Sequence, residues 1–175
     1  GMGGFGLEMV KRAAGYDMEI IAIDPVRRDR PVGVSELLDN SQENLHSLLR
    51  RADVVMLACP KTRETYHLIG GEELAQMKQG AYLINVTRGG IIDEDALYTA
   101  LANGQIAGAG LDVTEIEPLP ADSPLWQAPN IILTPHRAGA SQHRPRKVYE
   151  FFLAQLERYL KGETVLNIVD KQKGY

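Results

Sequence analysis

The sequence predicts an α/β protein built on a doubly wound parallel sheet. Short apolar runs recur at 19–23, 53–58, 81–86, 108–112 and 130–133, and helical patterns lie between them. None of these runs alternates apolar with polar residues, as the strands of a sheet with one wet face would. We therefore expect parallel strands that are buried on both faces and covered by helices.

Four helices are expected from apolar periodicity and capping residues, over 4–14, 42–50, 94–102 and 146–161. Ser41 and Asp93 are good N-caps for the second and the third helix. Gly104 and Gly162 can end the third and the fourth, because glycine adopts the left-handed conformation without a steric cost. Pro145 fits the first turn of the last helix, where a missing N–H does no harm.

A glycine pattern, G-x-G-x-x-G, opens the chain with Gly1, Gly3 and Gly6 and leads into the first predicted helix. Such glycines permit a tight turn and let the backbone approach a pyrophosphate at the N-terminus of the helix. The pattern alone is weak, because any glycine-rich turn can produce it. It predicts a dinucleotide-binding loop only in combination with an acidic residue at the end of the next strand.

Asp24 ends that predicted strand, 18 residues beyond Gly6. A carboxylate at this place can accept both ribose hydroxyls of NAD and would repel the 2′-phosphate of NADP. The alternative is that Asp24 is a turn residue before Pro25. Arg27 and Arg28 weaken the preference for NAD, since a nearby arginine can bind a 2′-phosphate, unless both belong to a solvated loop.

A dinucleotide-binding pattern normally follows a strand, and in the strand order 3-2-1-4-5-6 that strand is central. The sequence therefore predicts a Rossmann-type sheet that lacks its first, central strand. Either the chain is a fragment, or another segment fills the gap, or Gly1 and Met2 are the remnant of a tag before a natural start codon. Because unpaired buried backbone groups are costly, we expect this chain to self-associate as a homo-oligomer and to be weak or inactive alone.

Three later motifs each follow a predicted strand. They are N-V-T-R-G-G-I-I-D at 85–93, G-L-D-V-T-E-I-E-P-L-P at 110–120 and T-P-H-R-A-G-A at 134–140. In this order they resemble the motifs of the D-isomer-specific 2-hydroxyacid dehydrogenases, and the resemblance extends from Gly1 to the tail at 167–169. It implies an NAD-dependent enzyme that transfers a hydride between NAD(H) and a small D-2-hydroxy acid or 2-keto acid.

The resemblance implies three catalytic residues, Arg88, Glu117 and His136. Their chemistry fits the reaction, because reducing a 2-keto acid needs a hydride on carbon and a proton on oxygen. A histidine can give that proton and take it back in the reverse direction, and a neighbouring carboxylate stabilises the imidazolium form. A guanidinium can polarise the keto oxygen and bind the substrate carboxylate. The alternatives are that Arg88 is a surface residue at a strand end, that Glu117 is a solvated acid in a loop and that His136 is a packed loop histidine.

The resemblance also implies cofactor contacts at the pyrophosphate, at the adenosine and around the nicotinamide. In chain order these residues are Gly1, Gly3, Gly4, Phe5, Gly6, Asp24, Pro60, Thr65, Val86, Thr87, Arg88, Asp112, His136, Ala138 and Gly139. Asp112 has an alternative role as a cap at the end of its strand. Arg137 departs from the family, which usually has an aliphatic residue there.

Two segments are expected to differ in role. Residues 1–144 are expected to form the dinucleotide-binding domain, truncated at its N-terminus. Residues 145–175 are expected to form a C-terminal helix and tail, which in the family crosses to the substrate domain. The resemblance implies that this substrate domain, which is built largely from residues before the glycine pattern, is absent from the sequence.

Composition narrows the class of protein. The chain has 175 residues, of which 44% are hydrophobic and 24% charged, with a formal net charge of −4. These values are ordinary for a globular protein and provide no basic surface for nucleic acid. No apolar run is long enough to span a membrane and no secretory signal is visible, so we expect a cytoplasmic protein. A single cysteine and histidines without ligand spacing predict no metal site.

Two rival functions remain open. Some relatives of this fold act as transcriptional corepressors, so the chain could be an NAD-sensing binding protein. It could also be an inactive truncated product that folds by pairing with itself. The presence of Arg88, Glu117 and His136 argues against a purely regulatory role without excluding it.

Overall fold

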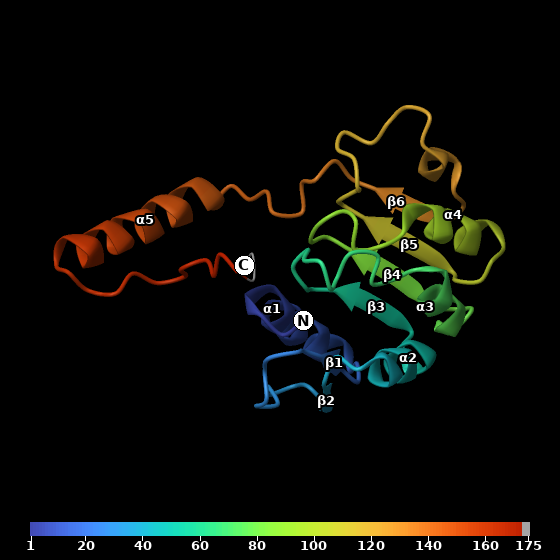
Figure 1. Cartoon of the computed structure of the whole chain (residues 1–175), viewed down its shortest axis with the longest axis horizontal. Helices are drawn as coiled ribbons and strands as arrows, with labels where there is room; N and C mark the ends of the chain where they lie inside the picture. Colours follow the sequence, from blue (N-terminus) through green and yellow to red (C-terminus); the bar gives the residue numbers. More distant parts are fainter. Residues whose placement is uncertain (173–175) are drawn as a thin grey trace. The chain divides into compact units, whose positions relative to one another are not determined.

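The computed structural model describes residues 1–172 and consists of two compact units, Gly1–His136 and a second one that begins at Arg137. The first unit alternates strands with helices, and the second contains one long helix (Figure 1). The predicted division of roles between 1–144 and 145–175 concerns function and stays a prediction.

Two parallel sheets form the framework of the first unit. In one, β1 (Ile21–Ile23) pairs with β2 (Glu36–Leu38). In the other, the strands pair in chain order: β3 (Val54–Leu57), β4 (Tyr82–Asn85), β5 (Gly108–Leu111) and β6 (Ile131–Leu133). All ladders are parallel, and the arrowheads of β3 to β6 point the same way (Figure 1). The predicted parallel α/β fold is confirmed.

The helices are α1 (Gly4–Ala13), α2 (Gln42–Arg51), α3 (Gly71–Gln76), α4 (Glu94–Ala102) and α5 (Arg144–Leu160). Short 3₁₀ turns cover Ala14–Tyr16 and Pro124–Gln127. The four predicted helices are present within two residues of their expected bounds. Helix α3 and strand β2 were not predicted, because both are too short to show a period.

The predicted helix ends are also present. Ser41 Oγ accepts from the Asn44 backbone N–H at 3.4 Å, and Asp93 accepts from Ala96 at 3.0 Å. Gly104 has a φ of 66° at the end of α4, the left-handed conformation that glycine adopts most easily.

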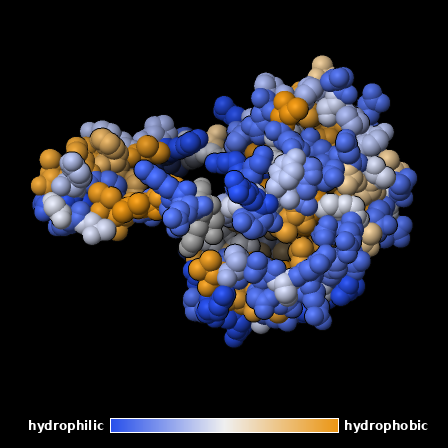
Figure 2. Space-filling model, viewed as in Figure 1, coloured by the Kyte–Doolittle hydropathy of each residue, from blue (hydrophilic) through white to orange (hydrophobic). Residues whose placement is uncertain are grey.

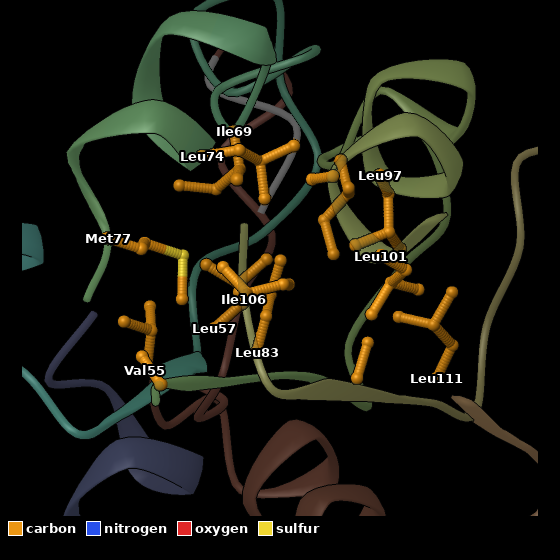
Figure 3. Packing of buried hydrophobic residues seen from close by; sticks show 14 of the residues in the cluster. Val55, Leu57, Ile69, Leu74, Met77, Leu83, Leu97, Leu101, Ile106 and Leu111 are labelled. Atoms are coloured by element: carbon orange, nitrogen blue, oxygen red, sulfur yellow. The ribbon is translucent and has the colours of Figure 1, made fainter. Parts of the chain in front are cut away.

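One face of the four-stranded sheet carries the main core. Val55 on β3 and Leu83 on β4 belong to one buried cluster with Leu97 and Leu101 of α4, and Met77 lies beside Val55 (Figure 3). Full burial of one such side chain stabilises the fold by about 1.5–3 kcal/mol. This core fixes the carboxyl ends of the strands, from which the functional loops emerge.

The opposite face of the same sheet is open. Val54, Tyr82 and Ile132 are 46%, 50% and 70% exposed. The expectation of strands buried on both faces is therefore wrong for the described residues. An apolar run indicates only that both faces of a strand can be buried. Whether a helix covers each face depends on the tertiary structure.

The two sheets stay separate among residues 1–172, since no described strand pairs β1 with β3. This agrees with the expected order of a doubly wound sheet without its first strand, and no other described segment fills that place. Gly1 lies between the ends of β1 and β3: its amino group donates to the Ile23 carbonyl at 2.8 Å. A Cβ at Gly1 would lie 2.6 Å from the Ala58 carbonyl.

The second unit exposes much apolar surface. Phe152 and Leu160 of α5 are 59% and 75% exposed, and Figure 2 shows hydrophobic side chains gathered over this helix. Pro145 lies in its first turn, as predicted. Across residues 1–172, no helix is both long enough and apolar enough to cross a membrane.

Candidate functional site

The glycine loop contains two kinds of glycine. A Cβ at Gly6 would overlap the Gly1 carbonyl and approach the Met2 side chain to 2.9 Å, so this position has no room for a side chain. Nothing lies within 4 Å of a Cβ placed at Gly3 or Gly4. Gly1 and Gly6 thus permit close packing of the backbone, while Gly3 and Gly4 leave the N-terminus of α1 accessible. Phe5 is 41% exposed beside them.

Asp24 follows β1, and its carboxylate holds the glycine loop against the next turn. Oδ2 accepts from Met2 N–H at 2.7 Å, and Oδ1 accepts from Val26 and Arg27 N–H at 2.9 and 2.8 Å. Burial by itself would raise the pKa of Asp24, but the hydrogen bonds from Arg27, Met2 and Val26 outweigh burial, and the net pKa is lowered. The carboxylate is therefore ionised at neutral pH and serves as a turn residue here.

A basic segment follows Asp24. The Arg27 guanidinium pairs with Asp29 at 2.7 Å, and Arg28 donates to the Pro25 carbonyl at 3.0 Å. Both arginines thus have partners within their own loop, as expected for a solvated segment.

Pro60 and Thr65 belong to one turn after β3. Thr65 Oγ1 donates to the Pro60 carbonyl at 2.7 Å and accepts from Thr62 N–H at 2.7 Å. The structure therefore brings together the two residues that were predicted to lie on the adenine side.

The loop after β4 is organised by Asn85, which is 2% exposed. Its Oδ1 accepts from the Thr87 N–H and hydroxyl at 3.0 and 2.9 Å, and its Nδ2 donates to the Arg88 carbonyl at 2.9 Å. Arg88 itself is exposed and donates to the Thr87 carbonyl. Asn85 was not among the predicted site residues, although a polar residue at the end of an apolar strand is a signal for such a role. Val86, between them, is half-buried.

Asp112 and His136 emerge from adjacent strands. Register places Leu111 opposite both Asn85 and Leu133, so the ends of β4, β5 and β6 lie side by side. Asp112 is 3% exposed and accepts from the Thr134 hydroxyl, and its carbonyl accepts from His136 N–H at 2.8 Å. His136 has a φ of 51°, a left-handed conformation that histidine adopts more readily than most residues.

Glu117 and His136 form a direct pair. His136 Nδ1 lies 2.7 Å from Glu117 Oε2, and Glu117 Oε1 accepts from Thr114 N–H at 3.2 Å. The hydrogen bond from His136 lowers the pKa of Glu117, so the carboxylate is ionised and can only accept. Nδ1 therefore carries the proton of this bond, and Nε2 is the nitrogen that can exchange a proton with a substrate.

Other predicted site residues are not brought into this pair. Among residues 1–136, no hydrogen bond or ion pair joins the Arg88 side chain to Glu117 or His136. Ala138 and Gly139 belong to the second unit and are not placed relative to the first.

Comparisons with known proteins agree on one family. The family model of the D-isomer specific 2-hydroxyacid dehydrogenase NAD binding domain matches residues 1–138. Glyoxylate reductase from Korarchaeum cryptofilum is 41% identical over 175 residues, which are 98% of this chain and 51% of that protein. The chain thus spans about half the length of the curated relatives it matches.

Solved structures show the same similarity. A D-isomer specific 2-hydroxyacid dehydrogenase from Xanthobacter autotrophicus Py2, in complex with NADPH and MES, has a TM-score of 0.91 and 36% identity, covering 100% of this chain and 70% of that one. The NADPH-dependent glyoxylate/hydroxypyruvate reductase from Sinorhizobium meliloti, in complex with NADP and sulfate, has a TM-score of 0.90 and 30% identity. The match covers 100% of this chain and 55% of that one.

Proposed function

The chain belongs to the D-isomer-specific 2-hydroxyacid dehydrogenase family, and from this premise we propose that the protein transfers a hydride between NAD(H) and a small 2-hydroxy or 2-keto acid. The observation that carries the proposal is the 2.7 Å bond between His136 Nδ1 and Glu117 Oε2. Relatives named glyoxylate reductase and glyoxylate/hydroxypyruvate reductase make glyoxylate and hydroxypyruvate the first substrates to test.

The glycine loop fits a dinucleotide. Because nothing lies within 4 Å of a Cβ placed at Gly3 or Gly4, the first N–H groups of α1 are open to a pyrophosphate, and the helix dipole favours negative charge there. Bound NADH would supply the hydride that reduces the keto carbon.

The chain's own residues supply the rest of the reaction. His136 gives the proton on Nε2 to the keto oxygen, so that C=O becomes CH–OH as hydride and proton add. Glu117 stabilises the imidazolium while the proton is held, and it fixes the ring through Nδ1. Arg88, exposed on the neighbouring loop, binds the substrate carboxylate and polarises the keto oxygen. In the oxidative direction His136 takes the proton back.

For the cofactor, we propose that Asp24 favours NADH over NADPH. The carboxylate is ionised, and a 2′-phosphate beside it would be repelled. Arg27 and Arg28 act in the opposite direction, and four solved relatives, including the two compared above, are complexes with NADPH or NADP. The balance between these charges sets the preference.

The test is NADH oxidation with glyoxylate or hydroxypyruvate by the full-length protein, because the 175 residues alone are expected to be weak or inactive. His136→Ala should lower kcat by about 10²–10⁴-fold and weaken NADH binding, followed by fluorescence, much less, because His136 is one of many expected cofactor contacts. NADH binding without turnover of either acid, or of a panel of larger 2-keto acids, would overturn the proposal in favour of an NAD-sensing protein. A homo-oligomeric state, a cytoplasmic location and the division at residue 144 stay predictions.

A further inference from the structure

A second group of acidic and aromatic side chains lies next to the proposed catalytic loops. Glu115 Oε1 accepts from the Tyr66 hydroxyl at 2.7 Å, and Glu115 Oε2 lies 3.1 Å from His67 Nε2. The rings of Tyr66 and His67 stack with their centroids 4.0 Å apart. We call Tyr66, His67 and Glu115 the Glu115 cluster. The proposed reaction uses none of its members.

The cluster joins segments that carry catalytic residues. The backbone N–H of His67 donates to the Gly90 carbonyl at 2.9 Å, two residues after Arg88. Glu115 lies two residues before Glu117, and its own N–H donates to Glu94 Oε1 in the first turn of α4. The His67–Glu115 contact therefore connects the loop that follows β5 with the loop that follows β3. The backbone hydrogen bond from His67 to Gly90 extends this connection to the loop that follows β4.

The two loops also touch directly. A Cβ at Gly89 would overlap the Thr114 carbonyl and lie 2.7 Å from the Glu115 backbone nitrogen. Between Arg88 and Glu117 the loops thus meet backbone to backbone. Any loosening of this contact changes the distance between the two proposed catalytic side chains.

Two carboxylates lie close to the His67 ring, those of Glu115 and Asp93. Asp93 Oδ2 lies 3.8 Å from His67 Nδ1, and Glu94 adjoins Glu115. Lys61 is the cation on the same side, 5.8 Å from the centre of the Tyr66 ring. Hydrogen bonds from Tyr66 and His67 lower the pKa of Glu115, which keeps the acceptor ionised. His67 and Glu115 are each 33% exposed, so water screens the pair only in part.

We propose that the His67–Glu115 pair clamps the Arg88 loop to the Glu117 loop, and that both are positioning residues for the reaction. The inference rests on the proposed function for its catalytic consequence. The clamp acts through geometry, because neither side chain belongs to the Glu117–His136 pair. Its loss should therefore slow turnover more than it weakens cofactor binding.

The variants are His67→Asn and Glu115→Ala, alone and together. Asparagine is chosen because His67 has a φ of 51°, which asparagine tolerates. Each single variant should lower kcat for keto-acid reduction by roughly 10–100-fold, as displacements of about 1 Å do. The Kd for NADH should change by less than about twofold. Because both residues act in one clamp, the double variant should be no worse than the poorer single variant.

Two matched variants separate positioning from general damage. Glu115→Gln keeps an oxygen that can accept from His67 Nε2 and has an amide that can donate to the Tyr66 hydroxyl oxygen, so it should restore most of the activity lost in Glu115→Ala. His46→Gln removes another histidine–acid pair, His46–Glu73 at 3.4 Å between α2 and α3, and should leave kcat unchanged. Equal loss in His46→Gln would mean that the effect is one of stability, and it would overturn the clamp.

A readout independent of turnover is amide hydrogen exchange at Thr87 and Thr114, whose N–H groups donate to Asn85 and Glu117. Exchange at both should speed up in His67→Asn and stay unchanged in His46→Gln. Unchanged exchange in His67→Asn would refute the clamp. A parent protein that neither binds NADH nor reduces any 2-keto acid would refute the proposed function, and exchange would still decide the clamp.

Discussion

Replacing Gly89 with alanine adds one methyl group where the two catalytic loops meet. Its φ lies outside the left-handed region, so alanine can adopt the backbone conformation and only space is lacking. The added Cβ would lie 2.7 Å from the Glu115 backbone nitrogen, about 0.7 Å less than the 3.4 Å of an ordinary contact. The Thr114 carbonyl would be closer still. Both obstacles are backbone atoms, so no rotamer change can relieve them.

Because the Thr114 carbonyl is the closer obstacle, the loops must move apart by more than this 0.7 Å, roughly 1 Å or more. We expect kcat/KM for keto-acid reduction to fall by about 10²-fold, since a misplacement of this size has such an effect. Overpacking should also lower the free energy of unfolding by about 1–3 kcal/mol, or roughly 2–4 °C in Tm per kcal/mol for a chain of this length. Steady-state kinetics, measured well below the Tm of the variant, separate the two effects.

Gly80→Ala is the matched control. Nothing lies within 4 Å of a Cβ at Gly80, and its φ is not left-handed. This variant should keep its activity and its Tm. If Gly89→Ala retains full kcat/KM, the contact between the loops does not set the catalytic geometry, and the reasoning is refuted.

Three further predictions concern charge. Asp24→Asn should lower the ratio of the Kd for NADPH to the Kd for NADH by at least about 10-fold, because a negative charge facing the 2′-phosphate is lost. An unchanged ratio in fluorescence titrations would show that Asp24 does not determine the choice of cofactor. Glu117→Gln keeps an acceptor for His136 Nδ1 but loses the charge that stabilises imidazolium, so the pH at which keto-acid reduction declines should fall, and coincident pH profiles would count against the pair. The pKa of Glu117 is lowered in the folded state, so the ionised carboxylate stabilises the fold at pH values above the ordinary pKa of a glutamate. This stabilisation is lost as the pH falls through the lowered pKa, and the Tm difference between the parent and Glu117→Gln should shrink over the same pH range. Burial, together with the charges of Glu115 and Asp95, raises the pKa of Glu94, although the hydrogen bond from the Glu115 N–H lowers it. Ionised Glu94 therefore destabilises the folded protein once the pH rises above the ordinary pKa of a glutamate. Glu94→Gln should be more stable than the parent at pH 7, by at most about 1 kcal/mol after screening, and the two should have equal Tm at pH 3.

The features that the sequence predicted well are local ones. Helices α1, α2, α4 and α5 follow from apolar spacing, and their ends follow from residues such as Ser41, Asp93 and Gly104, whose capping role depends on their own few neighbours. The Glu117–His136 pair was predicted from the family resemblance, and the sheet agrees with it, because the two residues follow β5 and β6, whose carboxyl ends lie at one edge.

The features that were missed depend on contacts between distant segments. Three residues of β2 show no period, and the open face of the main sheet looks the same in sequence as a covered one. Tyr66 and Glu115 are 49 residues apart and His67 and Glu115 are 48 apart. Only the packing of the loop after β3 against the loops after β4 and β5 brings them together, so no sequence motif contains both partners.

Asp24 has two roles that the sequence left open, a turn residue and a ribose acceptor, and the structure allows the two to coexist. An ionised carboxylate has about four lone-pair sites, and three are taken by the N–H groups of Met2, Val26 and Arg27. One ribose hydroxyl can therefore bind without rearrangement, on Oδ2, which has a single partner. Accepting both hydroxyls requires that the bond to Met2 be released, which would loosen the glycine loop at the moment the cofactor binds. The turn bonds of Asp24 thus hold the loop before binding, and their number limits how many ribose contacts the same carboxylate can add.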